Sequence, residues 1–83
     1  MVSISVDEFA RNYVKANKGE DLQVIKKNLK QSVKNKKIGA VCITCNSTIW
    51  AIGSAVVGWN GCFSCITGEA DSSEDYEIDT VNY

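Results

Sequence analysis

The chain has 83 residues, a formal charge of −1, four cysteines, and neither proline nor histidine. A domain of this length buries too little surface to be stable without help, so we expect a disulfide, a metal ion or a partner to stabilise it. Without histidine, the chain lacks the commonest general base, and no ordinary pair of nucleophile and base can be assembled. We therefore do not expect an enzyme.

Charged side chains divide the sequence into three segments. Residues 1–37 carry nine basic and four acidic side chains, residues 38–68 carry no charge, and residues 69–83 carry six acidic side chains. These boundaries predict a helical leader-like segment, an uncharged core-like segment rich in Cys, Ser and Thr, and an acidic tail. Because the tail is available to neutralise the basic side chains, we expect no nucleic-acid partner.

Two helices are expected in the first segment. Ser5 and Glu8 have the spacing of a capping box, which predicts a helix over about residues 6–18. A second helix is expected over about residues 20–35, where apolar side chains recur at helical spacing between lysines. That apolar stripe consists of Leu22, Ile25, Leu29 and Val33.

The uncharged segment has a different pattern. From residue 38 the helical spacing disappears, and β-branched and aromatic residues mix with Gly, Ser and Thr. The pair Asn60-Gly61 is a strong hairpin signal and predicts a two-residue turn. We therefore expect a short antiparallel β meander over about residues 38–67.

The acidic tail, residues 69–83, is expected to be largely disordered because it is strongly charged and contains few apolar residues. Within it, Tyr76 and Ile78 alternate with acidic neighbours, a pattern that allows a weak edge strand. The expected fold class is therefore a small α+β protein, with two N-terminal helices, an antiparallel meander and an acidic tail.

Two cysteine pairs suggest a metal site. Cys42-x2-Cys45 and Cys62-x2-Cys65 are separated by sixteen residues, which lies in the range of zinc ribbons. Four thiolates would hold one tetrahedral Zn ion, and binding would supply stability to a small chain. Neither pair is followed by the glycine that commonly completes a knuckle turn, and no Lys or Arg lies nearby to offset the negative charge. A zinc-ribbon-like interaction module is therefore kept as an alternative.

A second alternative is a small membrane-inserting protein. Residues 38–68 are uncharged over more than the ~20 residues that a spanning helix needs, and basic residues precede them. Small residues at four-residue spacing, such as Ala51 and Ala55, are typical of closely packed membrane helices. Polar residues, among them Asn46 and Asn60, interrupt the segment, and its composition favours strands.

The charged helical segment followed by an uncharged segment rich in Cys, Ser and Thr resembles the layout of ribosomally synthesised, post-translationally modified peptide precursors, including lanthipeptides and other bacteriocins. The resemblance implies that a leader is cut at Gly39-Ala40. It also implies that thiols and hydroxyls of the core are modified. The candidates are Cys42, Thr44, Cys45, Ser47, Thr48, Ser54, Cys62, Ser64, Cys65 and Thr67.

A leader-plus-core precursor is the leading hypothesis from the sequence. The resemblance implies a cytoplasmic precursor and a secreted, cysteine-rich product with an antimicrobial or signalling role, which acts on membranes or as a signal. The implied partners are a modification enzyme that binds the leader and an exporting peptidase or transporter. No cofactor of the chain itself is implied by this hypothesis.

Overall fold

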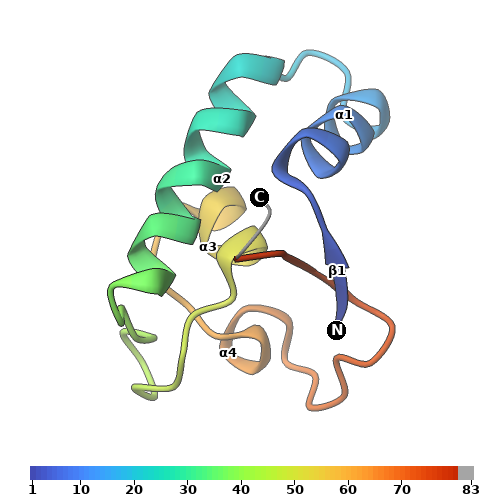
Figure 1. Ribbon diagram of the computed structural model, residues 1–83. Coiled ribbons are helices and arrows are strands. Elements are labelled where there is room, and N and C mark those ends of the chain that lie inside the picture. Colours follow the sequence, from blue (N-terminus) through green and yellow to red (C-terminus); the bar gives the residue numbers. More distant parts are fainter. Residues whose placement is uncertain (81–83) are drawn as a thin grey trace.

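The computed structural model describes residues 1–80, so the last three residues of the predicted acidic tail lie outside the described part (Figure 1). The elements, in chain order, are β1 (Val2–Ile4), α1 (Val6–Ala16), α2 (Leu22–Lys37), α3 (Ala51–Val57), α4 (Phe63–Thr67) and β2 (Tyr76–Ile78). Helix α2 contacts α1 and α3, while β2 contacts β1 and α3.

Local capping signals set the beginnings of the two long helices. The Ser5 side chain accepts a hydrogen bond from the Glu8 amide at 3.1 Å, and α1 begins at the next residue, as predicted. Helix α2 begins at Leu22 because the Asp21 carboxylate accepts from the Gln23 amide at 2.8 Å and so occupies the cap position. Both predicted helices are present, with ends shifted by about two residues.

An ion-pair cluster joins the first turn of α1 to α2. The Asp7 carboxylate contacts Lys26 of α2 and lies 3.0 Å from the Arg11 guanidinium. The hydrogen bond from Lys26 is the main reason why the pKa of Asp7 lies below its usual value of 3.8, and the charge of Arg11 adds to it.

We expect the Asp7→Asn variant to be less stable than the parent at neutral pH, and we expect this difference to shrink as acid protonates Asp7. A carboxyl whose folded pKa is lowered stabilises the fold above its unfolded pKa, and this contribution is lost as the pH falls through the folded pKa. Urea unfolding of the metal-loaded protein at pH 7 and in mild acid, above the pH at which protonation of the cysteines would release the ion, measures the difference. Glu20→Gln, which makes the same change in charge on an exposed side chain, is the control. A stability difference between Asp7→Asn and the parent that does not change with pH would contradict a stabilising role of the Asp7 carboxylate.

One apolar core connects the first segment with the uncharged segment. Leu29 and Val33 of α2 are fully buried, and Ala51 and Ile52 of α3 pack against them in the same cluster. The remaining buried members of this cluster, contributed by β1, α1, α2 and β2, are Ile4, Val6, Ala10, Ile25 and Ile78. Burial of this apolar surface is the main force that holds the two long helices against the rest of the chain.

The strands pair in a way that the sequence did not predict. Strands β1 and β2 form a two-stranded parallel sheet, in which Val2 faces Tyr76 and Ile4 faces Ile78. The predicted weak edge strand is therefore present in part of the acidic tail. Segment 69–75, which connects α4 to β2, contains turns and bends.

The predicted antiparallel meander over residues 38–67 is wrong. In its place the chain forms α3, α4 and connecting loops, with a single isolated antiparallel bridge between Val41 and Thr48. Strand preference depends strongly on surroundings, and here the apolar residues at the start of α3 are buried against α2. Among the described residues, no helix is both long and apolar enough to cross a membrane.

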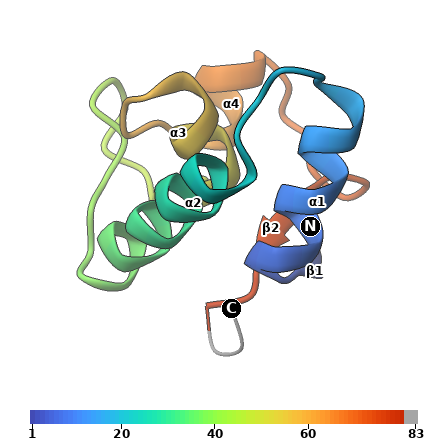
Figure 2. The ribbon, with the colours of Figure 1, turned by 90° about the horizontal axis from the view of Figure 1, so that it is seen from above.

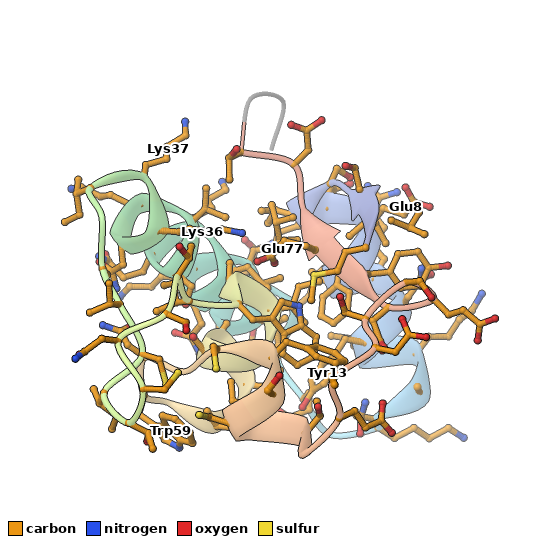
Figure 3. The ribbon with its side chains drawn as sticks, turned by 90° about the horizontal axis from the view of Figure 1, so that it is seen from below. Glu8, Tyr13, Lys36, Lys37, Trp59 and Glu77 are labelled. Carbon is orange, nitrogen blue, oxygen red and sulfur yellow. The ribbon has the colours of Figure 1, made fainter. Side chains whose placement is uncertain are left out.

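The Glu77 carboxylate fixes the start of α3. It accepts hydrogen bonds from the amides of Ala51 at 2.8 Å and Ile52 at 3.2 Å. The Lys36 ammonium of α2 also donates to it, at 2.8 Å (Figure 3). Glu77 is buried, and the amide of Ile78 also donates to it. A single acidic side chain of β2 therefore holds two helices in place and satisfies amides that a helix start leaves unpaired.

Asn60-Gly61 does not form a hairpin turn but lies in the connection between α3 and α4. Gly61 is absent from the residues with positive φ, whereas Gly58, at the end of α3, has a φ of 86°. The backbone of Gly61 is fixed by the buried Ser54 hydroxyl, which accepts from the Gly61 amide at 3.1 Å and donates to the Gly61 carbonyl at 3.2 Å. Glycine is needed here for close packing rather than for a turn.

We expect Gly61→Val to destabilise the fold by about 2 kcal/mol, because added atoms overpack the site. A Cβ at Gly61 would lie 2.5 Å from the Trp59 ring and 2.8 Å from Ile66. Urea unfolding measures the change, with Gly61→Ala as a smaller step and Ser64→Ala, on an exposed side chain of α4, as the control. A variant as stable as the parent would contradict this packing.

Candidate metal centre

The four cysteines come together although they belong to separate parts of the chain. Cys42 and Cys45 lie in the loop between α2 and α3, whereas Cys62 and Cys65 lie at the start of α4. Their four Sγ atoms all lie within 4.8 Å of one another, and all four thiols are free. The two pairs therefore form one cluster, as the spacing predicted.

The first pair sits in a tight loop that the backbone holds closed. The Cys42 amide donates to the Ser47 carbonyl at 2.7 Å, and the Asn46 amide donates to the Cys42 carbonyl at 3.0 Å. Asn46 has a φ of 63°, the left-handed conformation that asparagine tolerates better than most residues. Asn46 thus takes the place of the glycine whose absence weighed against a zinc site.

The second pair occupies the first turn of α4. Cys62 is the N-cap residue, and its Sγ accepts a hydrogen bond from the Cys65 amide at 3.4 Å. Residues three apart at the beginning of a helix lie on the same side, so both sulfur atoms face the first loop. The helix ends after Thr67 at Gly68, which has a φ of 78°.

Contacts outside the sulfur atoms hold the two halves of the site together. The Ile43 amide donates to the Asn60 carbonyl at 3.1 Å, and the Trp50 amide donates to the Gly61 carbonyl at 2.8 Å. The Trp50 ring also packs edge-on against Phe63 of α4, with ring centroids 4.9 Å apart. These contacts therefore hold the two cysteine pairs close together, so metal binding requires little rearrangement of the chain.

The sulfur positions fit a tetrahedral ion. A zinc–sulfur bond of about 2.3 Å implies sulfur atoms about 3.8 Å apart around a tetrahedral centre. The observed separations range around this value: Cys45 Sγ lies 3.4 Å from Cys62 Sγ, and no pair exceeds 4.8 Å. Movements of about 1 Å would complete the geometry. Four protein ligands leave no open position for substrate, which is typical of structural rather than catalytic zinc.

Backbone amides supply the local positive charge that the segment lacks in its side chains. The Thr44 amide donates to Cys42 Sγ at 3.4 Å. Such donors, chiefly the amides of Cys45 and Cys62, lower the pKa of Cys42 to about 6 in spite of its burial. The pKa of Cys45 is also lowered, by hydrogen bonds from Ser47. The absence of Lys and Arg therefore does not leave the thiolates without stabilisation.

Cys65 behaves in the opposite way. Its interactions with the neighbouring sulfur atoms of Cys62, Cys42 and Cys45 raise its pKa to about 12. In the metal-free protein Cys65 therefore keeps its proton at neutral pH, and a metal ion that binds there must displace it. Cys65 and Cys45 are exposed, whereas Cys42 and Cys62 are buried, so the cluster lies at the edge of the fold.

The hydroxyl groups named as modification candidates are dispersed. The Ser54 hydroxyl is buried against Gly61, and the Thr67 hydroxyl donates to the Phe63 carbonyl at 2.8 Å. The other hydroxyl candidates are exposed: Thr44, Ser47, Thr48 and Ser64. At the candidate cleavage site, Gly39 is exposed and Ala40 is half-buried, directly after α2.

Two residues that support the fold around the site were missed in the sequence. An asparagine directly after a Cys-x2-Cys pair is a usable signal, because asparagine accepts the left-handed conformation. Glu77 carried no local signal, because its partners in α2 and α3 are far away in the sequence.

Searches with the chain against protein-family models, curated proteins and solved structures found no match.

Proposed function

We propose that the protein is a small zinc-binding interaction module, in which Cys42, Cys45, Cys62 and Cys65 hold one structural Zn ion. The observation that carries the proposal is the convergence of four Sγ atoms, from two separate segments, within 4.8 Å. A tetrahedral set of four thiolates selects zinc or iron, and a closed site gives the ion a structural role.

The ion would strengthen a part of the fold that has little apolar core of its own. The main core cluster contains no cysteine, and the loop that carries Cys42 and Cys45 contains no regular helix or strand. Metal binding would fasten this loop to α4 and fix the surface that both segments form. The absence of histidine and the closed coordination support binding rather than catalysis as the role of the module.

Metal content of the protein purified under reducing conditions tests this proposal. We expect one zinc and no iron per chain by elemental analysis. Cys42→Ser and Cys65→Ser are expected to lose the ion, while Ser64→Ala, next to Cys65 but exposed, retains it. A reduced protein that binds neither zinc nor iron overturns the proposal. One iron per chain would overturn the assignment of zinc and show that the site holds iron instead.

The leader-plus-core precursor remains a prediction, and mass spectrometry of material from the native host separates it from the zinc module. An intact 83-residue chain with four thiols that react after metal removal would contradict the precursor and agree with the module. A product that begins near Gly39-Ala40 and carries mass changes at its thiols or hydroxyls would contradict the module, because modified cysteines cannot bind the ion.

A further inference from the structure

Helix α2 presents a positively charged face. The helix carries six lysines, and residues 22–68 contain no Asp or Glu. Two of these lysines are paired across the fold, Lys26 with Asp7 and Lys36 with Glu77. Three others line a shallow cavity of about 400 Å³ on the outside of α2, together with Lys26 and two glutamines. The three are Lys27, Lys30 and Lys34, and all are exposed.

The charge is not cancelled by the acidic tail. Of the tail residues, Glu77 is used in the ion pair with Lys36. Segment 69–75, which carries four more acidic side chains, lies on the other side of the molecule from α2 in both ribbon views (Figures 1 and 2). The expectation of no nucleic-acid partner depended on neutralisation of the lysines, and for Lys27, Lys30 and Lys34 the structure has no carboxylate at ion-pair distance among the described residues.

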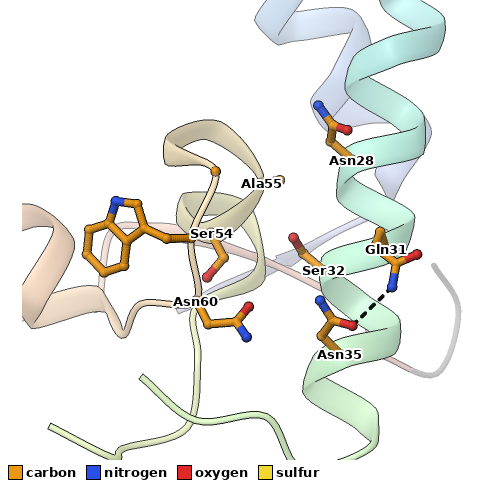
Figure 4. Close-up of a pocket in the computed structure, with 9 residues that line it drawn as sticks. Asn28, Gln31, Ser32, Asn35, Ser54, Ala55 and Asn60 are labelled. Atoms are coloured by element: carbon orange, nitrogen blue, oxygen red, sulfur yellow. Dashed lines mark hydrogen bonds between the residues drawn. The ribbon is translucent and has the colours of Figure 1, made fainter. Parts of the chain in front are cut away.

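A second cavity, of about 230 Å³, adjoins the lysines between α2 and α3 (Figure 4). Gln31 lines both cavities. Ser32, Asn35 and Asn60 direct polar groups into the space between the helices. The Gln31 amide donates to the Asn35 carboxamide oxygen at 3.0 Å, which leaves the Gln31 oxygen and the Asn35 amide nitrogen available to a ligand.

An exposed tryptophan is among the residues that line the second cavity. Trp59 lines it and keeps 38% of its surface exposed, in contrast to Trp50, which packs on Phe63. Carboxamides of Asn and Gln form paired hydrogen bonds with the edges of nucleobases, and exposed aromatic rings stack on their faces. A row of lysines binds phosphates. The two adjoining cavities therefore combine the three kinds of contact that a nucleic-acid strand requires.

A protein partner fits this surface less well. Lysine is depleted at protein–protein interfaces, and the interface core is usually apolar and aromatic. Here the outer cavity is lined only by lysines and glutamines, and no aliphatic or aromatic side chain contributes to it. Helical spacing sets Lys27, Lys30 and Lys34 about 4.5 and 6 Å apart along the axis, so that neighbouring phosphates of one strand can each meet a lysine.

We propose that this face binds single-stranded nucleic acid, with phosphates on Lys27, Lys30 and Lys34 and one base in the cavity beside Asn60 and Trp59. The proposal does not depend on the metal: none of these residues is a cysteine, and its failure would leave the zinc content unchanged. Binding by three phosphate contacts without further specificity gives a dissociation constant on the order of 10⁻⁵ M.

Fluorescence anisotropy with short labelled RNA and DNA strands of mixed sequence tests the proposal on the folded, reduced protein. Three phosphate contacts predict that the logarithm of the binding constant falls with the logarithm of salt concentration with a slope of about −2. Lys30→Gln/Lys34→Gln is expected to bring the slope to less than 1 in magnitude. The control Lys15→Gln/Lys18→Gln removes the same charge from exposed sites elsewhere and is expected to keep the slope near the parent value.

The second cavity is tested separately with Asn60→Ala and Trp59→Leu. Trp59→Leu is expected to weaken binding roughly tenfold through lost stacking, with the salt slope unchanged. Circular dichroism and metal content of every variant must match the parent. The proposal is overturned by absence of binding at low salt, by an equal effect of the two lysine pairs, or by unchanged affinity in both cavity variants. Equal binding of polyglutamate or duplex DNA also overturns it, in favour of an acidic protein partner or a general polyanion site.

Discussion

Removal of zinc from the reduced protein with a chelator is expected to unfold the whole chain. A domain of this size has a net stability of about 4–12 kcal/mol, whereas structural zinc sites contribute about 10–16 kcal/mol at neutral pH. The second quantity equals or exceeds the first, so little stability remains without the ion. Far-ultraviolet circular dichroism, dominated by α1 and α2, measures the loss, and added zinc is expected to restore the signal.

Cys42→Ser is expected to reproduce the chelator-treated state even with zinc present, because Cys42 is fully buried and a serine there binds zinc poorly. Ser64→Ala is expected to unfold only on chelation, as the parent does. If the helical signal of the parent survives the chelator, the fold does not depend on the metal. In that case an ion at the four cysteines stabilises only the loop and α4, which it joins.

Glu77→Ala is expected to lower the free energy of unfolding by about 3 kcal/mol, the range for breaking a buried charged pair. The substitution leaves Lys36 without its partner and removes the acceptor of the buried Ala51 and Ile52 amides. It also weakens the connection between β2 and α3, to which the Trp50 indole contributes by donating to the Tyr76 carbonyl at 2.8 Å. Denaturant unfolding of the zinc-loaded protein measures the change.

Two substitutions separate the roles of the carboxylate. Glu77→Gln keeps an oxygen that can accept from one amide but removes the charge, so we expect a loss of about half that of the alanine variant. Glu74→Ala removes an exposed acidic side chain from the same tail and is expected to change stability by less than about 0.5 kcal/mol. An equal loss in the Glu77 and Glu74 variants would show that Glu77 does not hold the helices in place.

Local signals in the sequence were sufficient for the long helices. The Ser5 cap and the apolar stripe through Leu29 depend on residues within one or two turns, and both appear in the structure. The start of α3 depends instead on Glu77, which follows it by about 25 residues. A preference of Val and Ile for strands could not reveal such a contact, and so the predicted meander was wrong.

The cysteine cluster was predictable from spacing alone, because two Cys-x2-Cys pairs specify a ligand set whatever connects them. Two sequence features that weighed against a zinc site are offset locally at the first cysteine pair. Asn46 adopts the left-handed conformation without glycine, and backbone amides such as that of Thr44 take the place of basic side chains. The Asn60-Gly61 signal failed because Gly61 is required by the neighbouring Trp59 ring rather than by a turn.

The parallel pairing of β1 and β2 predicts an order in which this fold assembles and opens. It joins residue 2 to residue 76, so its formation must close a loop through nearly the whole described chain, whereas all four cysteines of the candidate metal site lie between residues 42 and 65. The pairing is therefore expected to form last and to fray first. The Asp79 amide donates to the Ile4 carbonyl at 3.0 Å across the two strands. Faster hydrogen exchange at the Asp79 amide than at the Leu29 amide would reveal this order, and equal rates would contradict it. Strands β1 and β2 would then separate before the helical centre of the fold opens.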